Sequence, residues 1–258
     1  MKILLTNDDG YDAEGLQCLY ALLSQKHECV VVAPDRGRSC CSQAVTTGEP
    51  MSLHAIGTSV WSLSGTPADC VRVALLHLGI RPDLVISGVN HGGNLGVDIF
   101  YSGTVAAARE ACLMGVPSIA ISQYMKREIT RDWNVTASRA LYVLETVLQK
   151  VLPPKTFWNI NLPALPPERV EMDFQIRFCE PETQSLDFSF EVVPNAESPG
   201  QESAPPDVEL IQPNRHMPAS VLYKSNYQQR PRSPGTDVDL CFQGDASVSQ
   251  LGNFPTLF

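Results

Sequence analysis

Residues 3–10 read ILLTNDDG, and this stretch decides the fold. Its apolar first half, Ile3–Thr6, predicts a short buried strand, and the polar residues after it predict a tight turn. Leucines at positions 16, 19 and 23 share one face of the helix that follows, which Asp12 is placed to cap. Cys29–Ala33 predicts a second strand, which Pro34 ends. This stretch of chain therefore predicts a strand, a helix and a strand.

The same alternation continues to residue 162. We expect a loop at 34–50, a strand pair at 51–63, a helix capped by Thr66, a strand at 82–87, a helix over Thr104–Met114, a strand over Ser118–Ser122, a helix near 134–150 and a strand over Phe157–Leu162. Strands that alternate with helices predict an α/β fold with a mostly parallel sheet covered on both faces. Ligands of such sheets bind beyond the carboxyl ends of the strands.

The pattern changes after Pro163, so we place a domain boundary there, with a core over residues 1–165 and an extension over 166–258. The extension is predicted to hold two strands within 170–193, a flexible loop at 194–206, a strand near Ser220–Tyr223 and a short helix capped by Thr236. We expect this β-rich extension to pack on the core and on a partner subunit.

Composition and charge limit the function classes. The chain has 258 residues, a formal net charge of −9 and 43% hydrophobic residues, as expected of a globular protein without affinity for duplex nucleic acid or anionic membranes. No stretch is long and apolar enough to suggest a membrane span or a signal peptide. The eight cysteines show no zinc-type spacing. We therefore expect a cytoplasmic protein.

Two adjacent carboxylates, Asp8 and Asp9, follow the first strand directly. In the turn that Gly10 permits, the two side chains can converge, and they then repel each other unless a cation lies between them. A hard cation such as Mg²⁺ or Mn²⁺ meets this need. The equally weighted alternative is that one acid caps the next helix and the other is solvated.

Polar residues also follow two other strands. Asn90 lies in the glycine-rich stretch SGVNHGGN, residues 87–94, where its amide oxygen can reach the same cleft. Ser39, after the strand that ends at Pro34, offers a hydroxyl oxygen. The alternative for Asn90 is an ordinary Gly/Asn turn without a ligand. Arg36 and Arg38, beside Ser39, can attract phosphate, but we favour solvated loop charges.

Ser102, Gly103 and Thr104 enter the Ala-rich helix. The first N–H groups of a helix have no partner within the helix and attract anions, and Gly103 lets a phosphate approach the backbone. The alternative is an ordinary N-cap. For His91 we favour a surface role, for Asp98 support of its loop, and for the stretch GTP at 65–67 helix capping alone.

These motifs resemble those of the survival protein E (SurE) family of nucleotidases. The matching segments are ILLTNDDG (3–10), APD (33–35) with Arg38 and Ser39, GTPADCV (65–71), SGVN (87–90) with Gly92, Asn94 and Gly96, and YSGTVAAA (101–108). The resemblance implies a Rossmann-like three-layer core, a C-terminal extension exchanged between subunits in a homodimer or homotetramer, and metal-dependent hydrolysis of nucleoside 5′-monophosphates and possibly 3′-monophosphates.

The resemblance also implies roles for single residues. Asp8, Asp9, Ser39 and Asn90 correspond to the ligands of one divalent cation per subunit, and Asn94, Ser102, Gly103 and Thr104 correspond to the phosphate region. Two departures stand out: Cys40 replaces a glycine, which predicts a stiffer loop and a narrower pocket, and SVSQL at 247–251 replaces the family's usual C-terminal stretch.

The chemistry that we expect is attack by a metal-bound water, with Asp8 or Asp9 as the proton acceptor and Asn94 and the helix start holding the phosphoryl oxygens. The competing route is attack by Asp8 itself, which forms an aspartyl phosphate. Two other functions compete. One is a receiver-like Mg²⁺-binding signalling domain. Such a domain needs an acceptor Asp after a central strand and a Lys after a later strand, and this chain has neither at those places. The other is a nucleotide-binding module without turnover.

Overall fold

The structure is a computed structural model that describes residues 1–169, 173–193 and 220–252. Its elements are β1 (Lys2–Thr6), α1 (Glu14–Leu23), β2 (Glu28–Pro34), β3 (Leu53–Gly57), β4 (Val60–Leu63), α2 (Pro67–Arg72), the π-helical turn η1 (Val73–His77), β5 (Leu84–His91), the 3-10 turn η2 (Gly96–Phe100), α3 (Gly103–Leu113), β6 (Ser118–Gln123), α4 (Trp133–Val147), β7 (Thr156–Leu162), β8 (Ile176–Phe178), β9 (Phe188–Val193), β10 (Ser220–Ser225), the 3-10 turn η3 (Tyr227–Gln229), α5 (Asp237–Gln243) and β11 (Ala246–Gly252). They fall into two compact units, one of Met1–Gln184 with Arg232–Phe258 and one of Ser185–Pro231.

The first unit is built on one sheet with the strand order β3-β4-β2-β1-β5-β6-β7-β11-β8. The run from β4 to β7 is parallel throughout, whereas β3 and β11 are antiparallel to their neighbours β4 and β7. The predicted α/β fold with a mostly parallel sheet is confirmed. The first polar turn and the loop before β3 lie beyond the carboxyl ends of parallel strands. The glycine-rich stretch differs from the expectation, because Asn90 lies in the last residues of β5 and only residues 92–94 follow the strand.

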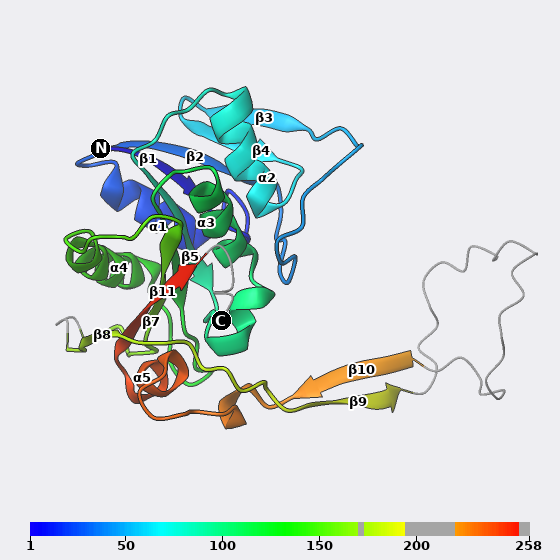
Figure 1. The fold of residues 1–258 in the computed structure, drawn as a ribbon, viewed down its shortest axis with the longest axis vertical. Helices are drawn as coiled ribbons and strands as arrows, with labels where there is room; N and C mark the ends of the chain where they lie inside the picture. Colours follow the sequence, from blue (N-terminus) through cyan, green and yellow to red (C-terminus); the bar gives the residue numbers. More distant parts are fainter. Residues whose placement is uncertain (170–172, 194–219, 253–258) are drawn as a thin grey trace, which may run out of the picture. The chain divides into compact units, whose positions relative to one another are not determined.

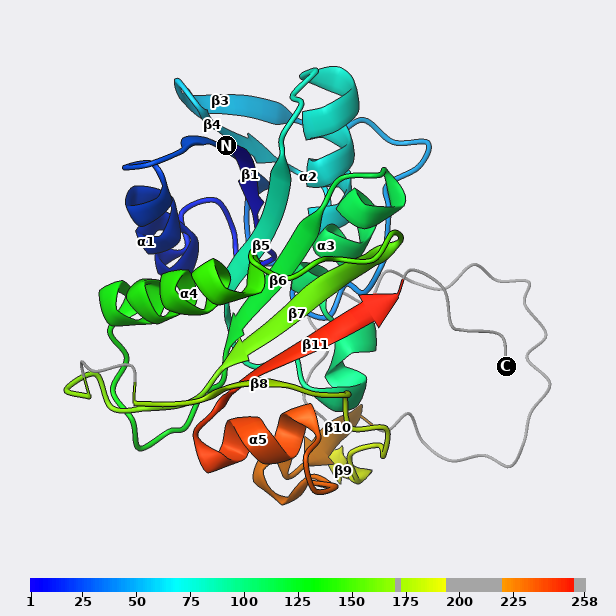
Figure 2. The same cartoon turned by 60° about the vertical axis from the view of Figure 1, so that its left-hand side comes forward.

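Helices cover both faces of this sheet, with α1 and α4 side by side on one face and α2 and α3 side by side on the other (Figures 1 and 2). Strand β1 shows how the sequence fills both layers. Ile3 and Leu5 pack in the core with α1 and α4, and Leu4 packs on the opposite face among residues of α2 and α3. Because successive strand residues point to opposite faces, a strand buried on both sides is apolar throughout.

The C-terminal part of the chain contributes to this same unit. We expected only irregular structure after the helix at 236, but Ala246–Gly252 forms β11, which lies between β7 and β8 in the sheet (Figure 2). The extension expected from residue 166 onward is therefore shared between the two units, since β8, α5 and β11 belong to the first. The flexible loop predicted at 194–206 lies outside the described residues.

The strand expected near Ser220–Tyr223 is β10, and in the second unit it pairs antiparallel with β9, with Phe188 opposite Ser225 and Phe190 opposite Tyr223. The rings of Phe188, Phe190 and Tyr223 contact one another at centroid distances of 5.9 to 6.3 Å. All three rings are more than half exposed. This hairpin therefore presents an aromatic face.

Two local expectations have different outcomes. Thr66 begins α2 with a complete capping box, in which its hydroxyl accepts from the Asp69 N–H and the Asp69 carboxylate accepts from the Thr66 N–H. The expected cap at Asp12 is wrong, because Ala13 is the N-cap of α1 and no side chain caps that helix. Within the described ranges, no helix is long and apolar enough to cross a membrane.

Candidate active site

The turn after β1 is shaped by its own residues. The side chain of Asn7 donates to the Gly10 carbonyl at 2.7 Å and accepts from the Gly10 N–H at 3.2 Å, which closes the turn around Asp8 and Asp9. Gly10 has a φ of +119°, a conformation that residues with a Cβ rarely adopt. The sequence NDDG therefore forms a local turn that places both carboxylates at the end of the strand.

Asp8 points toward the start of α3. Its carboxylate accepts a hydrogen bond from the Thr104 hydroxyl, and the residue is only 6% exposed. A Cβ on Gly103 would lie 2.8 Å from the Asp8 Cβ, so only glycine fits between Asp8 and the helix. Burial raises the pKa of Asp8 to about 6; the bond from Thr104 opposes this rise, and the negative charge of Asp9 adds to it.

Asp9 points toward the end of β5. Its Oδ2 accepts from the His91 N–H at 2.9 Å. The side chain of Asn90 donates through Nδ2 to the Gly92 carbonyl at 2.7 Å, which commits the nitrogen and leaves the oxygen as the atom available to a cation. The register between β5 and β6 shifts between Ser87 and Asn90, and such a bulge re-aims the side chains that follow it.

The loop that carries Ser39 contacts both the turn after β1 and the end of η2. The Arg38 N–H donates to the Asp8 carbonyl at 2.7 Å, which places Ser39 one residue away, and Ser39 itself is exposed. Farther along the loop, Ser42 donates from its hydroxyl to the Phe100 carbonyl at 2.7 Å. The predicted metal-ligand residues are thus brought to one edge of the sheet.

The stiffer loop and narrower pocket predicted from Cys40 stay predictions. The Cys40 side chain is exposed, and its φ of +57° is the left-handed conformation that glycine adopts most easily. The neighbouring Cys41 adjoins the site instead, because its Sγ would lie 2.8 Å from a Cβ on Gly103. Burial, and then the charge of Asp8, raises the pKa of the Cys41 thiol to about 11.

The start of α3 has features of both an ordinary N-cap and an anion site. The Ser102 hydroxyl accepts from the Val105 N–H at 3.0 Å and so serves as the ordinary N-cap. The Thr104 hydroxyl is used by Asp8. Both hydroxyls therefore have protein partners, and the groups that remain suited to an anion are the N–H groups of the first helical turn, beginning at Gly103.

Asn94 is buried and held from several sides. Its backbone N–H donates to Asn161 Oδ1 at 2.7 Å, and its carbonyl accepts from the side chains of Asn159 and Asn161 at 3.0 and 3.1 Å. Its side-chain nitrogen donates to the Ser122 hydroxyl at 2.7 Å. We did not identify these supporting residues from the sequence, although two asparagines that alternate with apolar residues in β7 are the signal that points to them.

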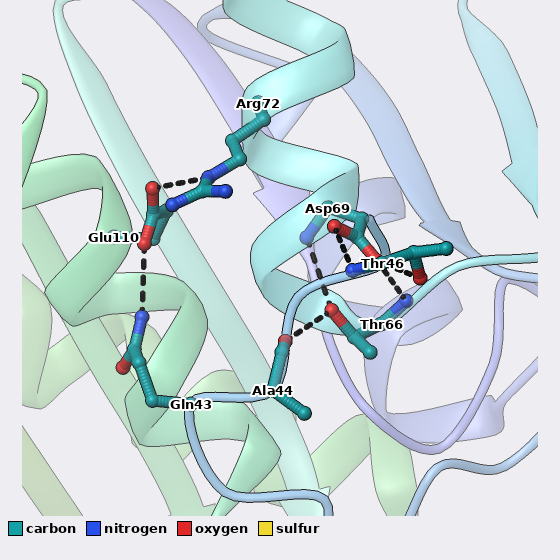
Figure 3. Close-up of polar contacts among 7 residues, drawn as sticks. All are labelled: Gln43, Ala44, Thr46, Thr66, Asp69, Arg72 and Glu110. Atoms are coloured by element: carbon teal, nitrogen blue, oxygen red, sulfur yellow. Dashed lines mark hydrogen bonds and ion pairs between the residues drawn. The ribbon is translucent and has the colours of Figure 1, made fainter. Parts of the chain in front are cut away.

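Two further acids hold the loops around the site. Asp69 accepts from the Thr46 N–H and hydroxyl besides capping α2, and Glu110 accepts from Gln43 and Arg72, so the loop after Cys41 is tied to both α2 and α3 (Figure 3). The GTP stretch at 65–67 also does more than cap a helix, because the Thr66 hydroxyl donates to the Ala44 carbonyl of this loop at 2.7 Å. On the other side, Asp237 of α5 accepts from the Gly96 N–H at 2.8 Å, which fixes the start of η2.

The donor atoms suit a hard cation. Within the described ranges, no three His, Cys, Asp or Glu residues form a cluster that could hold a metal. The candidate set instead offers carboxylate, hydroxyl and amide oxygens, the ligands that Mg²⁺ and Mn²⁺ prefer. The raised pKa of Asp8 also fits, because it marks a buried negative charge that a cation would stabilise.

The sequence and the fold are similar to those of known proteins. The family model of survival protein SurE matches residues 3–186. A relative from Nostoc sp. (strain PCC 7120), named "Putative 5'-nucleotidase alr3139", is 38% identical over 97% of this chain and 99% of its own length. A protein of Citrifermentans bemidjiense named 5'-nucleotidase SurE is 50% identical over 65% of this chain and 68% of its own length.

Among solved structures, the SurE protein from Aquifex aeolicus superposes with a TM-score of 0.79 at 30% identity, covering all of this chain and 95% of that one. The match spans the sheet, its covering helices and the turns that carry the acidic pair. The chain therefore belongs to the survival protein SurE family.

Proposed function

We propose that this protein is a 5′-nucleotidase, a phosphomonoesterase that uses one divalent cation per subunit to hydrolyse nucleoside 5′-monophosphates, with nucleoside 3′-monophosphates as a second candidate substrate. The observation that carries the proposal is the placement of Asp8 between Asp9 and the start of α3. A cation site and an anion site are thereby adjacent, as hydrolysis of a phosphate ester needs.

The names of the relatives support the same activity. The Citrifermentans bemidjiense relative is named a 5′-nucleotidase, and two relatives that match this chain over nearly its whole length carry the name "Putative 5'-nucleotidase". A receiver-like signalling domain is therefore excluded by family, and the nucleotide-binding module without turnover is the alternative to test.

The metal ligands that we propose are Asp8, Asp9, Ser39 and Asn90. A divalent cation bound there supplies a Lewis acid and lowers the pKa of an attacking water. Asp8 or Asp9 accepts the proton of that water. The N–H groups at the start of α3 and the side chain of Asn94 hold the phosphoryl oxygens, with Ser102 shaping the helix start and Thr104 orienting Asp8.

The decisive assay is phosphate release from a panel of nucleoside 5′- and 3′-monophosphates with Mg²⁺, with Mn²⁺ and with EDTA. We expect turnover that EDTA abolishes and added metal restores. Tight nucleotide binding by folded protein without release under any of these conditions would support the binding module instead.

The route of attack needs a separate measurement. In a single turnover of a substrate whose phosphoryl group is chiral by isotopic labelling, direct attack by water is one in-line displacement and inverts the configuration at phosphorus. Attack by Asp8 followed by hydrolysis of the aspartyl phosphate is two displacements and retains the configuration. This second result would replace the water mechanism by the aspartyl phosphate.

We also propose a homodimer or homotetramer whose subunits contact each other through the C-terminal extension. The exposed rings of Phe188, Phe190 and Tyr223 support this, because large aromatic side chains exposed together mark interaction surfaces. Light scattering should give a multimer for the wild type and a smaller species for Phe190→Ser. An unchanged mass would place the contact elsewhere.

The cellular compartment that we propose is the cytoplasm. All eight cysteines are free thiols, as expected of a reducing compartment. Fractionation of cells that express the tagged protein tests this.

A further inference from the structure

A groove lies beside the acidic pair, and no part of the proposed chemistry uses it. It is a hollow of about 270 Å³ between the first turns of α1 and α4, and Asp9 lines one end of it. A second hollow of about 380 Å³ shares Glu14, Arg131 and Trp133 with the first. Together they fall in the size class of small-molecule sites, roughly 300–1,000 Å³.

The indole of Trp133 is fixed in this groove by the packing of the two helices. Figure 2 shows α1 and α4 on the same face of the sheet. A Cβ on Gly15 of α1 would lie 2.9 Å from Trp133 Cζ3 and 2.2 Å from the Val89 carbonyl oxygen, so glycine lets the ring approach the helix backbone. The indole remains partly exposed on its other side.

His91 links the groove to the acidic pair. Its backbone N–H donates to Asp9, its ring Nε2 contacts the Arg131 guanidinium, and its ring meets Trp133 edge-on with centroids 6.1 Å apart. The indole, the imidazole and the guanidinium thus form one connected wall that ends at Asp9.

The chemistry of this wall fits a flat heterocycle joined to a polar sugar. Aromatic side chains and guanidinium groups stack on bases of any sequence. Polar groups such as Glu14 and Arg131 suit the hydroxyls of a ribose. A phosphate held at the start of α3, near the acidic pair, leaves the groove as the adjacent space for the rest of a nucleotide.

We propose that the groove lined by Gly15, His91, Arg131 and Trp133 binds the nucleoside part of the substrate. This inference rests on the proposed nucleotidase function. It assigns Trp133 as the surface on which the base stacks and Arg131 as a contact that favours nucleotides over simpler phosphate esters.

Phe100 and Tyr101 form the rival surface, because both are exposed and directly precede Ser102. Phe100 belongs to η2, and Tyr101 follows that turn directly. Neither residue lines the groove beside Asp9. A base that stacked on these two rings would approach the phosphate region from the side of the loop that carries Ser42.

The test compares two substrates in each variant, a nucleoside 5′-monophosphate and glycerol 3-phosphate, which has no base and no ribose. For Trp133→Ala and Arg131→Ala, we expect KM for the nucleotide to rise roughly 10- to 100-fold, with kcat for glycerol phosphate unchanged. Tyr142→Ala, on the same helix, is the matched control and should change neither. Equal losses on both substrates, or a selective loss only in Phe100→Ala, would overturn the inference.

Binding of a nucleoside tests the groove by a measurement that does not depend on catalysis. Adenosine should bind wild-type protein in equilibrium dialysis, and its Kd should rise about 10-fold or more in Arg131→Ala, which removes no core contact. If no phosphate ester is hydrolysed, the proposed function fails, while this measurement still decides the groove. Adenosine binding that both groove variants leave unchanged would exclude the groove as its site.

Discussion

Asp8 and Asp9 are neighbours in one turn, yet they lie in different surroundings. Asp8 is buried against α3, where the Thr104 hydroxyl and the closely packed Gly103 hold it. Asp9 is half-exposed and lines an open groove, held through the His91 backbone. One turn therefore has a rigid side suited to chemistry and an open side suited to entry of substrate.

The largest expected effect comes from the open side. Asp9→Asn keeps an oxygen for the His91 N–H but removes the charge that we assign to the cation. Loss of several kcal/mol of transition-state stabilisation should lower kcat/KM by at least about 100-fold. Steady-state assays with the metal concentration varied should show this loss together with weaker metal activation.

Asp12→Asn is the matched control for that experiment, since Asp12 is an exposed acid at the end of the same turn. It should leave kcat/KM within about twofold of the wild type. If Asp9→Asn changes kcat/KM as little as Asp12→Asn does, Asp9 is not a metal ligand, and the contrast drawn between Asp8 and Asp9 is wrong.

The next largest effect concerns the stability of the rigid side. Because burial raises the pKa of Asp8 to about 6, its charge destabilises the metal-free fold above that pH by up to about 3 kcal/mol. Below pH 4 the carboxyl is protonated in both the folded and the unfolded state, so the penalty is absent. It grows between pH 4 and 6, where only the unfolded state ionises.

Asp8→Asn should therefore stabilise the EDTA-treated protein at pH 7.5 and have no effect on its stability below pH 4. Urea unfolding of variant and wild type across this pH range measures the difference. A stability difference that does not change with pH would mean that Asp8 is not the buried charge that we infer.

The features around the two acids that depend on residues close in sequence could be predicted, whereas those that depend on residues distant in sequence could not. The turn at Asp8 and the start of α3 carry local signals, a strand end before glycine and a Ser-Gly-Thr helix start, so both were predicted. The missed contacts are distant in sequence. Strand β11 pairs with β7 across more than eighty residues, and its alternating SVSQ reads as irregular until that partner is known.

The support around Asn94 shows the same limit. Asn159 and Asn161 are polar residues inside a buried strand. The sequence therefore indicates that their side chains are hydrogen-bonded, but it does not identify the partners. Only the order β5-β6-β7 in the sheet places them near Asn94, which follows β5. The wrong cap at Asp12 has a different cause. Aspartate is a common N-cap residue, but the N-cap of α1 is the next residue, Ala13, and no side chain caps this helix.

A smaller effect should follow from loosening this support. Asn161→Ala removes partners from both the N–H and the carbonyl of Asn94, whereas Asn159→Ala removes one partner of the carbonyl alone. We expect Asn161→Ala to lower the free energy of unfolding by about 1–3 kcal/mol, and Asn159→Ala by less, because a buried N–H is left unpaired only in the first. Urea unfolding gives the order, and the reverse order would contradict the assignment.

The smallest effect is expected in the loop between the two sides. Cys40 has a φ of +57°, which costs a residue with a Cβ about 1–2 kcal/mol, while glycine loses about 0.5–1 kcal/mol of chain entropy on folding. Cys40→Gly should therefore stabilise the protein by at most about 1.5 kcal/mol. Thr47→Gly, an exposed control in the same loop without a positive φ, should destabilise it. Because the Cys40 side chain is exposed and does not line the site, kcat and KM should stay unchanged. A change in KM without a change in stability would instead mean that Cys40 touches the substrate, and that the loop belongs to the open side of the site.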